Sequence, residues 1–245
     1  MAKMFNSRTL KNLNKFPITE AGLELFPKGK GLIRNPGDMF LVWKTIEYFQ
    51  PKNLLEIGFW GGQSMGLYLE AGGPYDKIVA VDITYRLRSL FDELFPDTNI
   101  DFIESDSRKI ELNDKFDFIT IDGNHDYEFV NSDLKKCLPL LKHNSILYMD
   151  EYSICPGVEQ AIAENLLGQH NWIPFLAGVQ GMFFHHVSHS ADEFLDEFIQ
   201  NKADNFLMFK NNINWNGFTV LFCEAPLIYT DNNQFFIDVL KFYDL

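Results

Sequence analysis

Residues 54–64 read Leu-Leu-Glu-Ile-Gly-Phe-Trp-Gly-Gly-Gln-Ser, and this stretch decides the fold. An apolar run ends around an acid, Glu56, and then breaks into glycines, while a second apolar run, 78–81, is followed directly by Asp82. Glycine lets the backbone approach a ligand that a Cβ atom would exclude. An acid that closes the second strand can accept hydrogen bonds from both hydroxyls of a ribose. The order of strand, glycine turn, helix and acid-ended strand therefore predicts a nucleotide-type pocket in a doubly wound sheet.

Apolar runs alternate with helical patterns along the chain. Strands are predicted at 53–58, 77–82, 100–104, 116–121 and 145–150, and helices at 38–50, 62–71, 86–95, 127–141 and 156–167. Strands that are separated by helix-length segments favour a parallel sheet with crossover connections. Two more apolar stretches, 172–176 and 182–187, could complete a seven-stranded sheet with an antiparallel edge. The predicted class is α/β, with a doubly wound, mostly parallel, Rossmann-like sheet of about seven strands.

Three segments are expected in the chain. Residues 1–35 form an irregular N-terminal lead-in, residues 36–190 form the Rossmann-like domain, and residues 191–245 form a C-terminal α+β extension. The extension contains a helix-like run (191–208), a strand-like run (218–223) and an amphipathic segment (235–242). It is too apolar to be disordered. We expect it to pack on the core or to form the contact of a homo-oligomer.

Composition narrows the choice of partners. The chain has 245 residues, of which 46% are hydrophobic, and a formal net charge of -13. An acidic surface repels phosphate backbones, so we expect a small-molecule substrate and no nucleic acid. No apolar run approaches the ~18 residues of a membrane span, and residues 1–30 lack the pattern of a signal peptide. The cysteines, Cys137, Cys155 and Cys223, are unpatterned, which predicts thiols in a reducing, cytoplasmic compartment.

Acids gather at the ends of the predicted parallel strands. They are Glu56, Asp82, Asp106, Asp122 and Asp150. Right-handed crossovers bring all of these ends to one edge of the sheet, where open α/β sheets bind their ligands. The glycines are spaced more widely than in the GxGxxG fingerprint of dinucleotide-binding proteins, and an acid beside the turn disfavours a pyrophosphate. A cationic ligand with an amino acid head, a ribose and no phosphate suits this turn better, and S-adenosylmethionine is such a ligand.

Two motifs carry a resemblance to a known family. Together with Asp82, the runs Glu56-Ile-Gly-Phe-Trp-Gly-Gly-Gln-Ser64 and Ile121-Asp-Gly-Asn-His-Asp-Tyr-Glu128 resemble the class I S-adenosylmethionine-dependent methyltransferases. The nearest group is the small-molecule O-methyltransferases with an IDGxHxYE signature, which includes macrolide sugar O-methyltransferases and cephalosporin-hydroxylase-like proteins. The resemblance covers roughly residues 35–190.

The resemblance implies a position for the cofactor. The residues that would line its methionine end are Glu56, Gly58, Gly62 and Ser64. Asp82 would hold the ribose, and Asp106 with Ser107 would meet the adenine. We expect Asp122 to contact the cofactor as well as the metal ion.

A second group of residues suggests a metal site. Asp122 and Asp150 end strands that should be neighbours, so their carboxylates can converge, and Glu151 adds a third oxygen ligand. Carboxylates without cysteine favour a hard cation, most simply Mg²⁺, which can lower the pKa of a bound hydroxyl. In the resembling sugar methyltransferases, an acid at the Asp122 position and an acidic pair after the fifth strand bind magnesium. Many relatives carry His-Asp or Glu-Asp at this pair, so either Asp150 or Glu151 could be the ligand here.

The same resemblance assigns a general base. In those enzymes it is the histidine three residues after the first acid, which corresponds to His125. An unperturbed pKa near 6.5 suits proton removal at neutral pH. The alternative is a loop histidine bonded to the backbone, just as Asp150 and Glu151 could instead belong to the N-cap region of the helix at Pro156.

Other candidates carry less weight. The histidines at 185, 186 and 189 predict the surface of an edge strand, because neighbours on a strand point to opposite faces and cannot both bind one metal ion. Trp60 is the tryptophan whose position suits a substrate pocket. Cys155 lies near the same sheet edge but lacks an evident histidine partner for nucleophilic chemistry.

The favoured function is metal-assisted O-methylation of a small hydroxylated molecule of sugar or natural-product type. The main alternative is a non-catalytic binding or assembly protein on a methyltransferase scaffold. A nicotinamide-dependent oxidoreductase is weaker, because the glycine spacing and Glu56 both count against it.

Overall fold

The computed structural model describes residues Val42, Ile46, 49–152 and 155–166, together with the backbone of four later strands. The helix predicted at 38–50 is represented by Val42, Ile46 and Phe49, which are helical. The predicted lead-in 1–35, most of the helix-like run 191–208 and the segment 235–242 lie outside the described residues.

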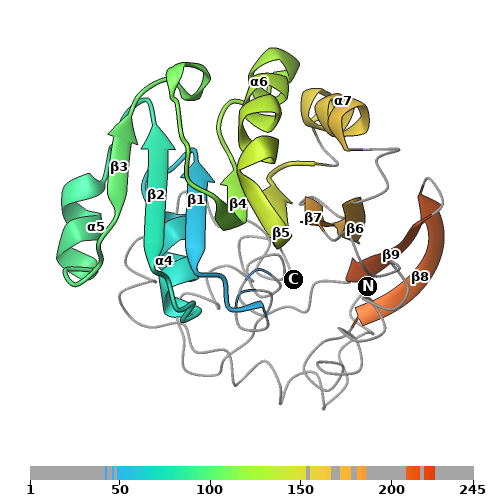
Figure 1. The fold of residues 1–245 in the computed structure, drawn as a ribbon, viewed down its shortest axis with the longest axis horizontal. Helices are drawn as coiled ribbons and strands as arrows, with labels where there is room; N and C mark the ends of the chain where they lie inside the picture. The colour runs from blue at the N-terminus through green and yellow to red at the C-terminus, as the bar shows by residue number, and fades with distance from the viewer. Residues whose placement is uncertain are drawn as a thin grey trace, which may run out of the picture.

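The main sheet has the strand order β3-β2-β1-β4-β5-β7-β6 (Figure 1). Its strands are β1 (Asn53–Ile57), β2 (Lys77–Asp82), β3 (Asp101–Glu104), β4 (Phe116–Ile121), β5 (Leu141–Met149), β6 (Trp172–Ala177) and β7 (Gly181–His185). The strands from β1 to β5 pair in parallel, whereas β7 is antiparallel to both β5 and β6. The prediction of a mostly parallel α/β sheet is confirmed. The prediction that the histidine-bearing strand is an edge strand is wrong, because β7 lies between β5 and β6; His186 and His189 lie outside the described residues.

Among the described residues, four helices connect or follow the parallel strands. They are α4 (Gln63–Glu70), α5 (Arg88–Leu94), α6 (Tyr127–Cys137) and α7 (Pro156–Asn165). The predicted boundaries agree closely except between α6 and β5, where a helix to residue 141 and a strand from residue 145 were expected. Pro139 instead lies in a 3-10 turn and β5 begins at Leu141. The polar start of β5 contains Asn144 with a φ of 56°, and the register with β4 shifts there, which hides the strand from a search for alternating apolar residues.

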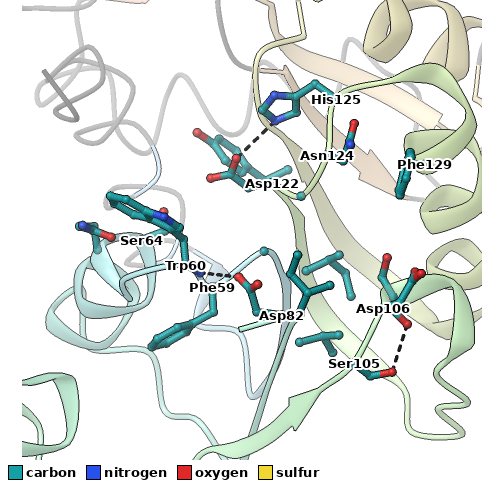
Figure 2. A pocket seen from close by; sticks show the side chains of 18 of the residues that line it. Phe59, Trp60, Ser64, Asp82, Ser105, Asp106, Asp122, Asn124, His125 and Phe129 are labelled. Atoms are coloured by element: carbon teal, nitrogen blue, oxygen red, sulfur yellow. Dashed lines mark hydrogen bonds and ion pairs between the residues drawn. The ribbon is translucent and has the colours of Figure 1, made fainter. Parts of the chain in front are cut away.

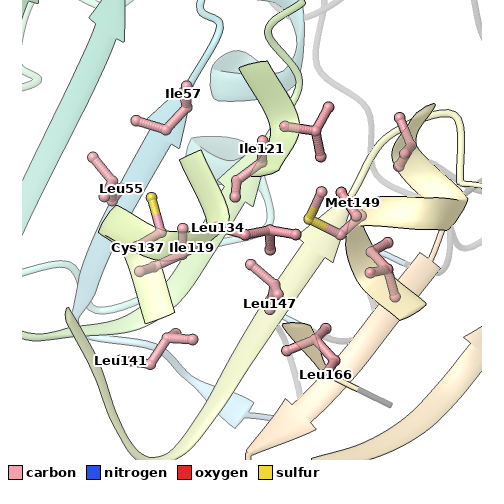
Figure 3. Close-up of a cluster of buried hydrophobic side chains, with 14 of the residues drawn as sticks. Leu55, Ile57, Ile119, Ile121, Leu134, Cys137, Leu141, Leu147, Met149 and Leu166 are labelled. Atoms are coloured by element: carbon pink, nitrogen blue, oxygen red, sulfur yellow. The ribbon is translucent and has the colours of Figure 1, made fainter. Parts of the chain in front are cut away.

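Apolar side chains cover both faces of the sheet. Alternate strand residues point to opposite sides, and one set packs against α6 and α7 (Figure 3). Its strand members include Leu55, Ile57, Ile119, Ile121, Leu147 and Met149, and its helix members include Val130, Leu134, Cys137, Val158, Ala161 and Ile162. On the other face, the Tyr68 ring of α4 lies edge-on to Phe118 of β4, with centroids 5.5 Å apart. Helices on both faces are what the doubly wound class requires.

Hydrogen bonding continues one residue past the strand ends. Backbone N–H groups of Gly58, Ser105, Asp122 and Asp150 donate to the carbonyls of Val81, Asp82, Ile57 and Ile121 at 2.8, 2.8, 2.8 and 3.1 Å. These bonds fix the backbone of the predicted site residues to neighbouring strands. The carboxyl edge of the sheet is therefore a rigid frame and not a set of independent loops.

A two-stranded antiparallel sheet of β8 (Met208–Trp215) and β9 (Phe218–Cys223) follows, and β9 is in contact with β6. The strand predicted at 218–223 is confirmed. The strand β8 was not predicted, because its centre, Lys-Asn-Asn-Ile-Asn, has low β propensity and its register shifts between Lys210 and Asn214. The division into three segments remains a prediction. Within the described part of the chain, every helix is too short or too polar to cross a bilayer.

Candidate active site

A cavity of about 690 Å³ opens at the carboxyl ends of β1, β2 and β4 (Figure 2). The chain order reverses between β1 and β4, and ligands of open α/β sheets bind at such a switch point. Of the predicted cofactor-binding residues, Gly58, Ser64, Asp82, Asp106, Ser107 and Asp122 line the cavity, as does the predicted base His125. Glu56, Gly62, Asp150 and Glu151 are absent from its lining.

The glycine turn brings the ends of β1 and β4 together. Gly58 has a φ of 94°, and a Cβ atom built there would lie 2.2 Å from the carbonyl oxygen of Asp122. Only glycine adopts this backbone conformation without strain and leaves room for the close approach. Gly62 has a φ of 82° and is the N-cap residue of α4. A Cβ atom there would meet the rings of Phe91 and Phe59, so the close packing of these rings also requires glycine at this position.

Asp82 holds the turn in shape. Its Oδ2 accepts the backbone N–H of Trp60 at 2.6 Å, and its Oδ1 accepts that of Thr84 at 3.1 Å. The first bond supports Trp60 in a left-handed conformation (φ 44°) that non-glycine residues rarely adopt. A carboxylate can accept about four hydrogen bonds. Asp82 therefore keeps acceptor capacity toward the cavity that it lines.

Glu56 lies beneath the cavity and not on its wall. The residue is fully buried, and neither carboxyl oxygen has a hydrogen-bond partner among the described residues. Burial raises the pKa of Glu56 well above its usual value, and the nearby charges of Asp122 and Asp82 raise it further. These charges and the burial both disfavour ionisation, so Glu56 keeps its proton up to a higher pH than an exposed glutamate would.

Asp106 and Ser107, which are expected to face the adenine, both form hydrogen bonds to other side chains of the protein. Arg108 donates to Asp106 from Nε at 2.9 Å and from Nη2 at 2.6 Å, and its backbone N–H donates at 3.0 Å. These bonds lower the pKa of Asp106 well below its usual range. The guanidinium also lies over the Phe129 ring, 4.0 Å from the centroid. Ser107 hydrogen-bonds to Asp133, which is buried in α6.

Three acids surround the imidazole of His125. Its Nδ1 lies 2.9 Å from Oε2 of Glu151, while its Nε2 lies 3.5 Å from Oδ1 of Asp122 and 3.8 Å from Oδ2 of Asp150. Asp150 is fully buried, and the side chains of His125 and Asp122 are 24% and 17% exposed. The two sides of one ring thus face different carboxylates. Of the two open alternatives, Asp150 converges with Asp122 and Glu151 does not.

The carboxylates of Asp122 and Asp150 could hold a divalent cation beside His125. One donor atom each from Asp122, His125 and Asp150 lies within 4.8 Å of the others. Ligands at 2.0–2.1 Å in an octahedron are about 3 Å apart, so modest side-chain shifts suffice. The N-cap residue of α7 is Cys155, and its N–H donates to the carbonyl oxygen of Glu151, so Glu151 also belongs to the turn before this helix.

Sequence reasoning missed several residues at the site. The cavity lining also includes Tyr68, Arg108, Asn124, Phe129 and Tyr148. Arg108 follows Asp106 by two residues, a spacing too common to signal an ion pair. Cys155 was set aside for want of a histidine partner, yet its thiol donates to Oε2 of Glu151 at 3.0 Å, the same oxygen that faces His125.

Comparisons with known proteins bear on the fold that carries this site. Residues 55–152 match a family model described as a methyltransferase domain. A search of curated protein sequences gives no match.

Solved structures share the fold. An SAH-bound methyltransferase of Podospora anserina is 21% identical, with a TM-score of 0.54 over 75% of this chain and 97% of that one. An O-methyltransferase of Bacillus cereus in complex with SAH is 16% identical, with a TM-score of 0.53 over 69% and 91%. CalS11, a TDP-rhamnose 3'-O-methyltransferase of calicheamicin biosynthesis, is 20% identical, with a TM-score of 0.50 over 72% and 91%. At these identities the likeness establishes the Rossmann-like methyltransferase fold.

Proposed function

We propose that this chain transfers the methyl group of S-adenosylmethionine to a hydroxyl of a small molecule, with help from Mg²⁺; the match of residues 55–152 to a methyltransferase family model supports this. The acceptor would be of sugar or natural-product type. The observation that carries the proposal is His125 on the cavity wall, with Nε2 between Asp122 and Asp150 and Nδ1 against Glu151. This supplies a base, its orienting partner and an acidic pair in one place.

The cofactor would lie along the carboxyl edge of the sheet. Asp82 would accept from the ribose hydroxyls, and Ser64 with the glycine turn would contact the methionine end. Asp106 and Ser107 would border the adenine, with Asp122 near the sulfonium. Glu56 would act from below: a cationic amino group above it favours its ionised form, so binding would lower its pKa.

His125 would take the proton of the acceptor hydroxyl. The carboxylate of Glu151 beside Nδ1 favours the tautomer with its proton on that nitrogen, which leaves a lone pair on Nε2. S-adenosylmethionine would supply the methyl group to the hydroxyl oxygen, and its sulfur would leave as a neutral thioether. The hydroxyl proton moves to Nε2. Mg²⁺, held by Asp122 and Asp150, would lower the pKa of the hydroxyl.

Calorimetric titration with S-adenosylmethionine and S-adenosylhomocysteine tests the cofactor. We expect Asp82→Asn to weaken binding about 10–100-fold, the value of a hydrogen bond to a charged group. The exposed Asp97→Asn is the matched control and should bind normally. Absence of binding heat up to millimolar ligand, in correctly folded wild-type protein, would rule out this cofactor.

A second test separates catalysis from binding. His125→Ala should slow methyl transfer about 10²–10⁴-fold while S-adenosylmethionine binds as before, and the exposed His143→Ala should behave like the wild type. If His125→Ala left transfer unchanged, the base assignment would be wrong. Binding of the cofactor without transfer to any of a panel of hydroxylated acceptors would favour the alternative, a non-catalytic assembly protein.

The metal is tested with Mn²⁺ as a paramagnetic substitute for Mg²⁺. Asp122→Asn and Asp150→Asn should each weaken Mn²⁺ binding, as seen in water proton relaxation, and EDTA should reduce transfer. Asp126→Asn, in the same loop but exposed, is the control. Unchanged Mn²⁺ binding in both variants would mean that the two carboxylates are structural.

The surface charge bears on the partner. A formal charge of -13 favours a small-molecule acceptor over nucleic acid.

We also propose that residues 191–245 contribute to a homo-oligomer if they do not pack wholly on the core. Light scattering of the full chain tests this, and a monomer at all concentrations would exclude it.

A further inference from the structure

We propose that the chain has a second cation site, specific for zinc-like ions, built from Cys155, Glu151 and Nδ1 of His125. Glu151 and Cys155 lie outside the lining of the cavity. The site therefore occupies the side of the imidazole that faces away from Asp122 and Asp150. Its occupant would be a thiophilic divalent cation, Zn²⁺ in the first instance.

The donor atoms already converge. Oε2 of Glu151 lies 2.9 Å from Nδ1 of His125 and 3.0 Å from Sγ of Cys155, and one donor atom from each residue lies within 4.8 Å of the others. All three residues are half-buried, so a hydrated ion can reach them. Ligands at 2.0–2.3 Å from a tetrahedral Zn²⁺ are about 3.3–3.7 Å apart. Small outward shifts of the side chains would open the required space.

The backbone holds these residues together. Cys155 is the N-cap residue of α7, and its N–H donates to the carbonyl oxygen of Glu151 at 3.0 Å. Two residues later, a Cβ atom on Gly157 would lie 2.7 Å from the carbonyl oxygen of His125. Glycine is thus needed for α7 to pack on the loop that carries His125. A site on such close-packed elements has little freedom to separate its ligands.

The donor types select the ion. Sulfur, imidazole nitrogen and carboxylate oxygen are the ligands that Zn²⁺ takes in proteins, and three of them leave a fourth position for water. Mg²⁺ prefers oxygen ligands and has no use for the thiol. The two sides of His125 would therefore discriminate between ions, with Mg²⁺ at Asp122 and Asp150 and Zn²⁺ at Glu151 and Cys155.

Zinc binding would change which ring nitrogen of His125 carries the proton. The Cys155 thiol loses its proton to solvent as the thiolate–zinc bond forms, and the neutral imidazole, bound through Nδ1, must carry its own proton on Nε2. Nε2 then donates and can no longer accept. Resting on the proposed function, this makes Zn²⁺ an inhibitor of methyl transfer that leaves the cofactor pocket intact.

Cobalt(II) substitution tests the site directly in the full-length chain. We expect one bound Co²⁺ with a thiolate-to-metal charge-transfer band, displaced by Zn²⁺, and loss of that band in Cys155→Ser. Zn²⁺ affinity should fall by more than the roughly 10–100-fold that changes outside the coordination shell cause. Cys223→Ser is the control that keeps Cys155 and the band. A band that survives in Cys155→Ser, or unchanged Zn²⁺ affinity there, would overturn the proposal.

Charge removal gives an independent check if Cys155→Ser folds poorly. Glu151→Gln should weaken Zn²⁺ binding, while Glu159→Gln, an exposed acid in the first turn of α7, should not. Equal effects of the two variants would mean that only the general charge matters and would also overturn the site. Zn²⁺ inhibition of transfer should be relieved in Cys155→Ser. Absence of any transfer in the metal-free wild type and with Mg²⁺ would instead contradict the proposed function, since the cobalt spectrum does not depend on activity.

Discussion

Asp133 is a buried acid directly behind the wall of the cavity. It lies in α6, only 2% exposed, and accepts a hydrogen bond from Ser107 on the cavity wall. Burial, the main cause, raises the pKa of Asp133 to about 6, against a hydrogen bond from Ser107 that lowers it. The folded protein therefore keeps the proton on Asp133 up to a higher pH than an exposed aspartate would.

Because of this residue, the free energy of unfolding should fall as the pH rises from about 4 to about 6. A raised carboxyl pKa gives stability that is complete below the unfolded-state pKa and is lost as the pH rises through the folded-state value. The loss is on the order of 3 kcal/mol for a shift of about two units. Asp133→Asn should remove this dependence and be more stable than the wild type at pH 7. Urea unfolding at several pH values measures it, with the exposed Asp126→Asn as control; an unchanged pH dependence in Asp133→Asn would contradict the assignment.

Gly58 and Gly72 form a natural pair for separating backbone strain from steric clash. Both have positive φ, 94° and 75°, but a Cβ atom on Gly72 meets nothing within 4 Å, whereas on Gly58 it meets the Asp122 carbonyl. Gly72→Ala should cost only the backbone strain, about 1–2 kcal/mol, and keep ligand binding. Gly58→Ala should cost more and abolish S-adenosylmethionine binding, as read by unfolding and calorimetry. Equal costs would show that the turn has room to adjust.

Among the elements, α6 fastens the His125 loop to the sheet. Leu134 is fully buried between this helix and the strands, so Leu134→Ala should cost about 2–5 kcal/mol through lost contacts and a cavity. Ile83, 71% exposed at the cavity mouth, is the control: Ile83→Ala should change stability by less than about 0.5 kcal/mol. Chemical denaturation compares the two. A small cost at Leu134 would mean that α6 repacks easily.

The sequence was sufficient for the parallel strands because each is an apolar run of strand length that lies between helical patterns. The start of β5 and all of β8 were missed for one physical reason: pairing can continue through polar residues when a neighbour supplies the hydrogen bonds. At the site, Asp122 was predicted from its place at a strand end, and His125 from the resemblance to a known family. The position of Glu151 was not, because it follows from a left-handed backbone at that residue (φ 52°), which no local pattern announces.

For the whole molecule, net charge should affect stability. A formal charge of -13 makes the folded state repel itself, and about 0.15 M salt reduces the reach of such charges to about 8 Å. The melting temperature should therefore rise when NaCl is raised from about 10 mM to about 150 mM. Scanning calorimetry measures the change. A melting temperature that falls would show that attractive ion pairs, such as Lys77 with Asp114, outweigh the repulsion.

The acids at the carboxyl edge of the sheet also bear on turnover. In the proposed reaction the sulfonium carries a positive charge on arrival, and the thioether that remains after transfer is neutral. The negative charge of Asp82, which lines the cavity, attracts the first and exerts no net Coulombic attraction on the second. The chemical step itself would thus weaken the binding of the spent cofactor. The charge that favours binding of the substrate form would therefore not slow release of the product.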